Sequence, residues 1–445
     1  MTGNVNGNIL EKLFHLKKSG TNVRTEVIAG LTTFATMSYI LAVNPLILSA
    51  SGMEFGKTFA ATAITSAIAC VIMGLHANLP FGLSAGMGIN AFFSYVVCLG
   101  MGYSWQWALS AIFVEGIIFI LLTFFNIREV LVNSIPTGLK KAIGAGIGLF
   151  IAYIGLQNAG IIVADPEGTI STLNPNWFMG SAGVAIIGII ITGALLVYKV
   201  KGAILIGILL TTLIGIPFGV TQYAGGSYLP SMPYFCNFAF HEIFASKESV
   251  FDFCIVVLTF LFLDMFDTVG TLIGCADKSG IIREDGSISN CKQALMADAI
   301  GTTVGAMLGT STVTTFVESA TGVAEGGRTG LTAITTGLMF LSSLFFEPLF
   351  GSIPYAATAP ALIIVGLMMV VPIREINFKD YTESIPAFLS ILVMVCASSI
   401  SDGIMFGILF YMFFKIISRQ FKDLNPAIIL MAGLFVIKIV VSIII

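Results

Sequence analysis

Long apolar runs separated by short polar breaks recur along the chain from about residue 28 to the C-terminus. Most runs approach the ~20 residues that a helix needs to cross a bilayer. The runs are continuous and do not alternate, so they favour membrane helices over the strands of a membrane barrel. The pattern predicts fourteen spans, near 28–49, 58–75, 80–98, 106–125, 138–160, 178–198, 202–220, 249–274, 291–308, 310–325, 329–347, 355–372, 383–400 and 402–418.

Composition excludes a water-soluble fold, because only 10% of the 445 residues are charged while 56% are hydrophobic. A typical soluble domain carries about 25% charged residues. Residues 1–25 lack an apolar core, so we interpret them as a cytosolic N-terminal segment and not as a cleaved signal. The net charge of −3 comes with no basic stripe, and no nucleic-acid partner is expected.

The distribution of Lys and Arg predicts the orientation. With a cytoplasmic N-terminus, the extracytoplasmic breaks hold only Lys57 and Lys247, and all other basic residues outside the C-terminal segment fall on the cytoplasmic side. The positive-inside rule therefore predicts an even number of spans in a cell (inner) membrane. The apolar segment 425–445 contains Lys438, and the pattern leaves open whether this segment spans the membrane.

An internal repeat divides the chain into halves. Residues 129–136 and 347–354 share the pattern Glu-x-Leu-x-x-Ser-Ile-Pro, and the pair Gly148 and Gly366 keeps the same offset of 218 residues. Ile-x-x-Gly-Ile-Leu at 204–209 returns at 404–409. With an odd number of seven spans in each half, the second half must enter the membrane from the opposite side. Such inverted repeats are typical of secondary transporters, which hold substrate at the repeat interface.

The third and tenth spans are poor membrane helices. Residues 80–90 contain a proline and three glycines, and residues 309–322 are rich in Ser, Thr and β-branched side chains. We expect a short extended stretch in each, followed by a helix starting near Asn90 or Glu318. Irregular backbone at membrane depth must be buried in protein or line a cavity, so these segments should meet and frame a site.

Carboxylates inside apolar runs are the candidate site residues. Asp264 and Asp267 share one face of span eight, and Glu318 lies in span ten. Glu115 in span four is either a further functional acid or a local helix contact. The positions of Asp252 and Asp298, near the predicted span ends, favour an interfacial location.

These acids suit a proton-coupled carrier of a planar heterocycle. Burial and a neighbouring acid both favour the protonated form of a carboxyl group, so at least one of the set is expected to exchange a proton near neutral pH. Carboxylates accept from ring N–H groups, while backbone N–H groups and the Asn90 amide bond the ligand. The flanking residues expected to supply backbone or supporting contacts are Gly88, Ile89, Thr268 and Val317.

A stacking wall is one interpretation of four phenylalanines near these acids, and lipid or core contact is the alternative. They are Phe92, Phe93, Phe262 and Phe266. Arg328, in Glu-Gly-Gly-Arg-Thr-Gly, is interpreted as a cytosolic anchor and not as a ligand. The seven cysteines show no metal-ligand spacing and the three histidines are isolated, so no metal or cofactor is expected besides the coupling protons.

Several motifs together resemble the AzgA-like purine permeases, a branch of the nucleobase:cation symporter-2 family. They are Asn-Val-Arg-Thr-Glu-Val-Ile-Ala-Gly-Leu-Thr-Thr at 22–33, Ala-Gly-Met-Gly-Ile-Asn-Ala-Phe-Phe at 85–93, Phe-Asp-Thr-Val-Gly-Thr-Leu-Ile at 266–273, Gly-Thr-Ser-Thr at 309–312 and Glu-Ser-Ala-Thr-Gly-Val at 318–323. The likeness runs from about Leu13 to the C-terminus. The Phe-Asp-Thr-Val-Gly-Thr form is more similar to the hypoxanthine and guanine carriers than to the adenine carriers.

The resemblance implies an all-α polytopic fold of fourteen spans in two inverted seven-span repeats, with short strands in spans three and ten. It implies a cytosolic segment 1–25, a core domain at 26–126 and 249–349, a gate domain at 127–220 and 350–420, an extracytoplasmic loop 221–248 and a C-terminal segment 421–445. Matching the motifs places substrate binding on Asn90, Asp264 and Glu318, with Asp267 also important. Burial, and not the resemblance, leads us to expect Glu318 or Asp264 as the proton carrier, with Glu318 preferred. Pairing of two copies through the gate domain stays open.

Two other classes of function compete with purine symport. An anion transporter or channel on the same scaffold would hold sulfate or bicarbonate at helix N-termini, but acids in the site disfavour an anion. An aspartyl intramembrane protease would place its two acids on different helices, whereas Asp264 and Asp267 share one. With no nucleophile and base arrangement in the sequence, an enzyme is not expected.

Overall fold

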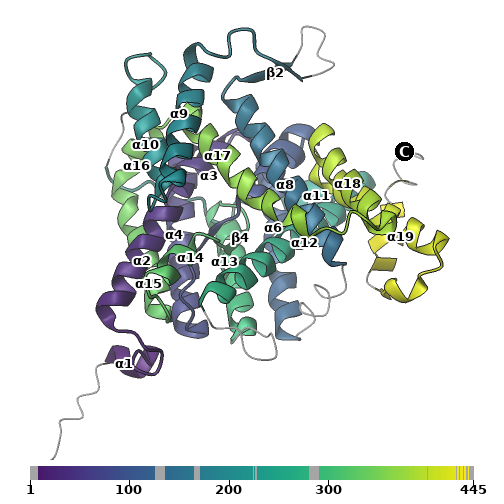
Figure 1. Ribbon diagram of the computed structural model, residues 1–445, viewed down its shortest axis with the longest axis horizontal. Helices are drawn as coiled ribbons and strands as arrows, with labels where there is room; N and C mark the ends of the chain where they lie inside the picture. The colour runs from purple at the N-terminus through teal and green to yellow at the C-terminus, as the bar shows by residue number, and fades with distance from the viewer. Residues whose placement is uncertain are drawn as a thin grey trace, which may run out of the picture.

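The computed structural model is mostly helical (Figure 1) and describes residues 9–125, 136–164, 171–223, 225, 228–279, 290–397 and 399–426, with eight more positions between 428 and 439. Most of the first repeat motif, 129–135, and part of the C-terminal apolar segment lie outside the described residues. The helices are α1 (Ile9–Phe14), α2 (Val23–Met37), α3 (Ile40–Ser49), α4 (Phe55–Ile72), α5 (Met87–Ala91), α6 (Trp105–Phe124), α8 (Thr137–Asn158), α9 (Gly180–Val197), α10 (Ala203–Gly215), α11 (Phe240–Ile243), α12 (Lys247–Ser279), α13 (Cys291–Leu308), α14 (Ser319–Ala324), α15 (Gly330–Ser342), α16 (Glu347–Gly351), α17 (Tyr355–Val370), α18 (Tyr381–Cys396) and α19 (Ile400–Ile417).

Short π-helical segments extend α4 to Ala77 and α5 to Gly100. Four short strands accompany the helices: β1 (Leu83–Ala85), β2 (Ile162–Ala164), β3 (Ser171–Leu173) and β4 (Val313–Thr315). β1 pairs with β4, and β2 pairs with β3 as a hairpin. The strands of spans three and ten were predicted and are confirmed. The β2–β3 hairpin was not, because its segment appears in the sequence only as a polar loop between two apolar runs.

Among the described residues, seven helices are long and apolar enough to cross a membrane. They occupy Val23–Ser49, Phe55–Ala77, Trp105–Phe124, Gly138–Asn158, Gly180–Val197, Gly330–Gly351 and Tyr355–Glu375. Shorter apolar helices at Met87–Gly100, Ala203–Gly215 and Tyr381–Cys396 add to them. The chain is therefore built as a multi-pass membrane protein, while the count of fourteen spans stays a prediction.

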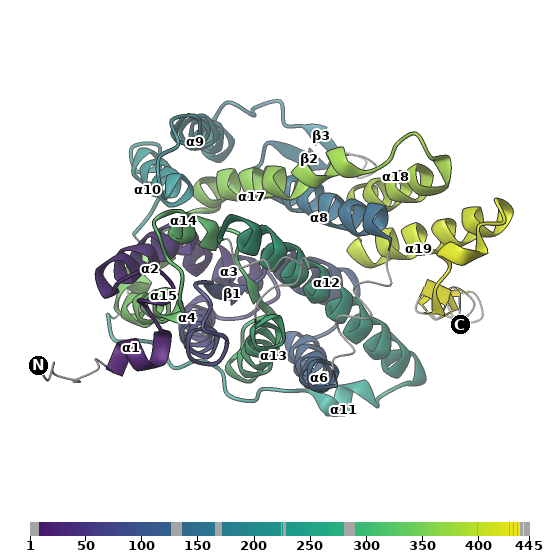
Figure 2. The same cartoon turned by 60° about the horizontal axis from the view of Figure 1, so that its bottom comes forward.

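The helices form two groups that lie side by side (Figure 2). The first group packs α2, α3, α4, α6, α12, α13, α14 and α15 around the β1–β4 pair, and the second packs α8, α9, α10, α17, α18 and α19 mainly against one another. The first group is built from both halves of the chain, and so is the second. The paired strands lie where segments from both halves cross.

Equivalent glycines of the two halves contact each other, as the internal repeat suggests. Gly148 of α8 and Gly366 of α17 face one another so closely that a Cβ on Gly366 would lie 2.4 Å from the carbonyl oxygen of Gly148. The reciprocal distance, from a Cβ on Gly148 to the Gly366 carbonyl oxygen, is 2.6 Å. Mutual contact of this kind arises when a pseudo-twofold axis passes between the two residues.

The two ends of the bundle can be told apart by their contacts. On one end, the side-chain amide of Asn78 donates to the Phe14 carbonyl and that of Asn290 to the Ala77 carbonyl. On the other end, the Tyr103 hydroxyl donates to Asp252 at 2.7 Å. Spans that follow one another thus end on alternate faces, and the N-terminal helix α1 marks the first face.

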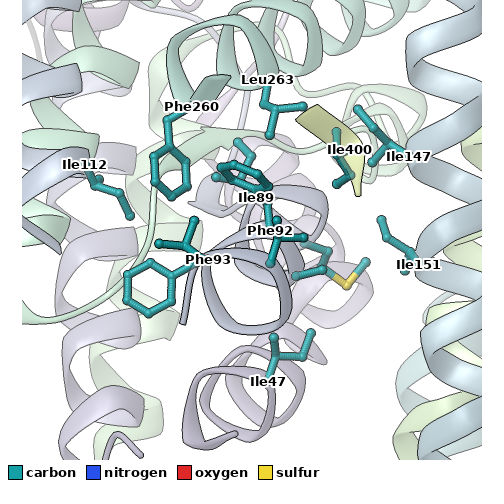
Figure 3. Packing of buried hydrophobic residues seen from close by; sticks show 14 of the residues in the cluster. Ile47, Ile89, Phe92, Phe93, Ile112, Ile147, Ile151, Phe260, Leu263 and Ile400 are labelled. Carbon is teal, nitrogen blue, oxygen red and sulfur yellow. The ribbon is translucent and has the colours of Figure 1, made fainter. Parts of the chain in front are cut away.

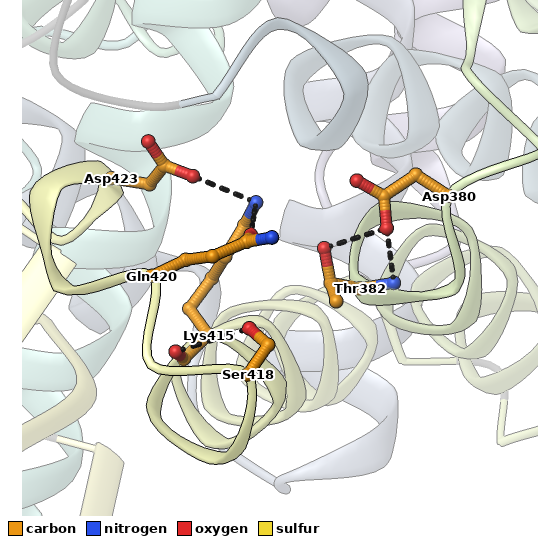
Figure 4. Close-up of polar contacts among 6 residues, drawn as sticks. All are labelled: Asp380, Thr382, Lys415, Ser418, Gln420 and Asp423. Atoms are coloured by element: carbon orange, nitrogen blue, oxygen red, sulfur yellow. Dashed lines mark hydrogen bonds and ion pairs between the residues drawn. The ribbon is translucent and has the colours of Figure 1, made fainter.

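Polar side chains tie down the ends of the second group. Asp380 caps α18 by accepting from the backbone N–H of Thr382 at 2.8 Å. At the end of α19, the buried Lys415 ammonium donates to Gln420 at 2.6 Å and Asp423 at 2.9 Å (Figure 4). Asp380 thus satisfies a free N–H group at the start of α18, while Lys415 ties the segment after α19 back to that helix.

Candidate functional site

The β1–β4 crossing brings spans three and ten together at the middle of the first helix group. The strands are antiparallel, with Ser84 opposite Thr314 at their centre. Backbone hydrogen bonds continue the pairing on both sides, from Gly86 N to Thr312 O at 2.9 Å and from Phe316 N to Gly82 O at 3.0 Å. The prediction that the two broken spans meet is confirmed.

Side chains satisfy the extended backbone and hydroxyl groups of span ten one residue after another. This matters because an unpaired polar group is costly at membrane depth. Each partner comes from a different part of the first helix group. The pairs are Thr310 with Asn44, Ser311 with Asn90, Thr312 with Glu115, Val313 with Thr302 and Thr314 with Thr268.

Glu115 accepts from the Thr312 hydroxyl at 2.9 Å and is fully buried. Of its two interpretations, this geometry favours the local contact that supports the strand. Arg328 donates to the carbonyls of Val323 and Gly327, both at 2.7 Å, and so closes the end of α14. This agrees with an anchoring role for Arg328.

A helix starts after each strand, with its N-terminus at the crossing. α14 begins at Ser319 with Glu318 as its N-cap residue, as predicted. α5 begins at Met87 after the extended Gly86, so Asn90 lies one turn inside the helix and the predicted start was three residues late. Both helix N-termini point toward the strand crossing, where they favour electronegative groups.

Thr268 joins two buried carboxylates in the interior. Its hydroxyl lies 3.0 Å from Oδ1 of Asp264, 3.0 Å from Oδ1 of Asp298 and 2.9 Å from the Thr314 hydroxyl. Asp264, Asp298 and Thr268 are all fully buried. The interfacial location predicted for Asp298 is wrong, because α13 continues well beyond this residue in both directions and turns it toward α12 and β4.

Asp267 and Glu318 are more accessible than Asp264. Both are partly exposed, and they lie within electrostatic range of each other. A carboxylate oxygen of Asp267 lies 3.5 Å from the point where a side chain on Gly86 would begin. Asp267 is therefore beside the N-terminus of α5, and Glu318 occupies the N-cap position of α14.

The accessible side of this site faces the end of the bundle that carries the N-terminus. Val317, next to Glu318, is 48% exposed despite lying beside the central strand. Farther along α14, Thr321 is partly exposed and Ala324 is exposed. The end of α14 contacts the N-terminal segment through a hydrogen bond from Thr21 to the Gly326 carbonyl.

An apolar cluster fills the space on the opposite side of the site (Figure 3). Ile89 and Phe92 of span three pack there with Ile147 of α8 and Ile400 of α19, so the cluster joins both helix groups. Gly88 is part of the same contact, since a side chain on it would lie 2.6 Å from Ile147. The supporting residues Gly88 and Ile89 therefore pack against the second helix group.

The predicted stacking residues are buried in this packing. Phe92 meets Phe260 edge to face at 5.0 Å between ring centroids, and Phe93 and Phe262 are buried nearby. The side chain of Phe266 lies outside the described part of the structure. The described geometry of these rings fits the core interpretation better than a wall exposed to ligand.

A pocket of about 120 Å³ lies beyond the apolar cluster, toward the other face. Phe92, Val96 and Met101 line one side, and Asp252 and Asp402 are among its other walls. It is lined by α12 and the start of α19, so it too lies between the two helix groups.

Asn90 does not share the accessible space. It is fully buried, and its side-chain oxygen accepts from the Ser311 hydroxyl. Within the described residues, its amide nitrogen has no hydrogen-bond partner. Of the four predicted binding residues, Asp267 and Glu318 are therefore partly accessible, while Asp264 and Asn90 are fully buried.

Tyr39 is a site residue that sequence reasoning missed. Its hydroxyl donates to Oε1 of Glu318 at 2.8 Å, and the side chain is buried. Tyr39 lies in an apolar run of span one, 279 positions from its partner, and no local pattern distinguishes it from a core aromatic. Asp298 and Thr314 were not assigned to the site either, because their contacts with Thr268 arise only in the folded chain.

The inventory of the site limits its chemistry. It offers carboxylate acceptors and hydroxyl groups beside two helix N-termini. Within the residues described, no cluster of three or more His, Cys, Asp or Glu could hold a metal ion. The arrangement can accept hydrogen bonds from a polar ligand and exchange protons.

Relatives similar in sequence cover nearly the whole chain. A putative permease of Methanocaldococcus jannaschii is 46% identical over 97% of this chain and 98% of its own. The adenine permease AdeP of Escherichia coli is 42% identical over 97% and 96% of the two chains. The guanine/hypoxanthine permease PbuG of Bacillus subtilis is 42% identical over 97% and 98%.

Two solved structures share the fold at low sequence identity. The transmembrane domain of the cyanobacterial bicarbonate transporter BicA aligns with a TM-score of 0.65 at 14% identity, covering 86% of this chain and 97% of that domain. Murine Slc26a9, an anion transporter in the inward-facing state, aligns with a TM-score of 0.66 at 11% identity, covering 94% and 73%.

A family profile, Xan_ur_permease, matches residues 24–406. With relatives of more than 40% identity along nearly the full length, the resemblance to purine permeases found in the sequence is confirmed. This multi-pass membrane protein belongs to the Permease family.

Proposed function

We propose that this chain imports purine nucleobases across the cell inner membrane together with protons, with hypoxanthine and guanine favoured and adenine as the alternative purine. The observation that carries the proposal is the pair of accessible carboxylates, Asp267 and Glu318, at two helix N-termini beside the strand crossing. Purines present ring N–H donors, which carboxylates accept, and ring nitrogens and carbonyls, which backbone N–H groups can bond.

The relatives support a purine over other heterocycles. Those at 40–42% identity over nearly the full length include both adenine permeases and guanine/hypoxanthine permeases. The identities are too similar to separate these substrates. The preference for hypoxanthine and guanine rests on the span-eight motif at 266–271.

The architecture that we propose has fourteen spans, with the first helix group as the core domain and the second as the gate domain. The contact between the equivalent glycines Gly148 and Gly366 supports an inverted repeat about an axis through the middle of the molecule. The exposed Val317 and the apolar cluster on the far side support an arrangement open toward the N-terminal, cytoplasmic face.

In this proposal, Asn90, Asp264, Asp267 and Glu318 bind substrate, and Glu318 or Asp264 carries the proton. Glu318 is the stronger candidate for direct contact because it is partly exposed, whereas Asp264 is buried behind Thr268. Activity–pH curves of Glu318→Gln and Asp264→Asn separate the two carriers. An unshifted curve for Glu318→Gln would exclude it as the proton carrier.

An anion transporter remains the alternative function, since both solved structures of similar fold are anion transporters by name. Two observations disfavour it for this chain. A shared fold at 11–14% sequence identity does not identify the substrate. In addition, Asp267 and Glu318 already place negative charge at the helix N-termini that would hold an anion.

The test is uptake of radiolabelled hypoxanthine into proteoliposomes with an imposed pH gradient, acid outside. Guanine, adenine, uracil and sulfate serve as competitors, and Glu325→Gln is the matched control for Glu318→Gln because both glutamates flank α14. We expect gradient-driven uptake that guanine blocks and that only Glu318→Gln abolishes. Sulfate uptake without purine uptake would establish the alternative.

A further inference from the structure

We propose that Tyr39 is a positioning residue for Glu318, holding one carboxylate oxygen so that the other is presented to the ligand. This inference rests on the proposed role of Glu318 in binding and adds a residue from the opposite half of the chain. The Tyr39 hydroxyl donates to Oε1 of Glu318 at 2.8 Å.

The surroundings of Tyr39 fix its hydroxyl in place. Tyr39 is 1% exposed and lies at the junction between α2 and α3, where the helix is interrupted. Its ring cannot swing into solvent, and a buried phenol needs a hydrogen-bond partner. Glu318 is partly exposed, so it is the mobile member of the pair and Tyr39 is the fixed one.

The pair continues a row of contacts between α2 and α14. One turn earlier, the hydroxyls of Thr36 and Thr321 lie 3.0 Å apart. Beyond them, Gly322 packs so closely on α2 that a side chain there would lie 2.1 Å from the Thr33 hydroxyl. These contacts fix the position of α14 along α2. This position in turn determines where Glu318, at the start of α14, lies.

Tyr39 constrains the direction of the Glu318 carboxylate as well as its position. Asp267 lies within electrostatic range of both Tyr39 and Glu318. Without the hydroxyl, repulsion from Asp267 and free rotation would both draw Glu318 away from a single orientation. Each of the two carboxylate oxygens can accept hydrogen bonds, so the bond from Tyr39 to Oε1 leaves Oε2 available to a ligand donor.

The test removes only the hydroxyl, in Tyr39→Phe, with Thr36→Val as the matched control. Thr36→Val deletes the neighbouring hydroxyl contact with Thr321, but it keeps both the Tyr39–Glu318 hydrogen bond and the close packing of Gly322 on Thr33 that holds α14 in place. We expect Tyr39→Phe to raise the KM for hypoxanthine about tenfold, equivalent to about 1.4 kcal/mol, with Vmax within about twofold of wild type. Thr36→Val should change KM by less than about twofold.

A double-mutant cycle distinguishes positioning from general packing. If Tyr39 acts through Glu318, adding Tyr39→Phe to Glu318→Gln changes purine binding no further. Equal losses of binding in both backgrounds would overturn the proposal, as would a wild-type KM for Tyr39→Phe. The amount of folded protein in the membrane, measured for every variant, excludes a folding defect as the cause.

A second readout requires no substrate and so separates this inference from the proposed function. The carboxyl band that Glu318→Gln removes from the infrared spectrum should shift in Tyr39→Phe and stay in place in Thr36→Val. A wild-type protein that transports no purine would refute the proposed function but not this contact. An unshifted band in Tyr39→Phe would refute the contact itself.

Discussion

Removing the hydroxyl of Thr268 is expected to destabilise the centre of the protein. This group lies 3.0 Å from Asp264, 3.0 Å from Asp298 and 2.9 Å from Thr314. A hydroxyl has a single proton, so it can donate to only one of the two carboxylates while accepting from Thr314. Thr268→Val keeps the shape of the side chain and deletes these interactions together.

The size of the effect follows from the burial of the partners. A hydrogen bond to a charged group contributes about 1.5–3 kcal/mol, and a buried acceptor left without its donor costs about 1–3 kcal/mol. The added methyl group returns less than about 1 kcal/mol. We therefore expect Thr268→Val to lower the free energy of unfolding by about 2–4 kcal/mol and to reduce purine uptake, because Asp264 loses its hydrogen bond with Thr268.

The assay is an SDS unfolding titration of the purified protein in mixed micelles, with uptake measured in parallel. Thr268→Ser retains the hydroxyl and should stay within about 1 kcal/mol of wild type, since it loses only a methyl group. Thr212→Val is the control, because the Thr212 hydroxyl donates to the Ile208 carbonyl of its own helix and not to an acid. If Thr268→Val unfolds at the same SDS concentration as Thr212→Val and transports normally, the Thr268 hydroxyl does not hold the two acids.

Three further predictions concern positions away from the acids. Gly366→Ala should lower the yield of folded protein, measured by fluorescence-detected size exclusion, because its side chain would meet backbone on α8; Gly144→Ala, with open space around it, should not. Glu26→Gln should lower thermal stability, since this buried carboxylate accepts the backbone N–H groups at the start of α15. Backbone and side-chain hydrogen bonds from Thr382 lower the pKa of Asp380. The contribution of this cap to stability is therefore complete at neutral pH and is lost as the pH falls through the lowered pKa of the folded protein. Asp380→Ala should thus destabilise the protein at neutral pH and much less in acid, once the pH is below this lowered pKa.

The sequence predicted those features of the site that have a local chemical signal. Glycine, threonine and β-branched residues in spans three and ten predicted the strands, and the structure places them at Leu83–Ala85 and Val313–Thr315. Acids in an apolar run stand out in the same way, which is why Asp264 and Asp267 were found. The start of α5 was placed late because Gly86, and not a polar side chain, precedes the helix.

Partners distant along the chain gave no such signal. In the sequence, Tyr39 cannot be told from any buried aromatic, and Asp298 lies near the end of a predicted span. Only the fold brings Tyr39 to Glu318 and Asp298 to Thr268. The internal repeat could have indicated one long-range contact. Residues related by a twofold axis that lie near it must meet, as Gly148 and Gly366 do.

The scaffold is symmetric in its backbone but not in its chemistry. Both halves supply a strand and a helix N-terminus to the crossing, yet the acids Asp264, Asp267, Asp298 and Glu318 all belong to the second half. From the first half, Tyr39 contacts an acid of the site directly, and the acid Glu115 is bound to the Thr312 hydroxyl as a support for the strand. A ligand between the two N-termini would therefore meet carboxylates from one half and backbone N–H groups from both. Such a site favours a planar molecule with donors on one edge and acceptors on the other, as purines have, over an anion that needs donors on every side.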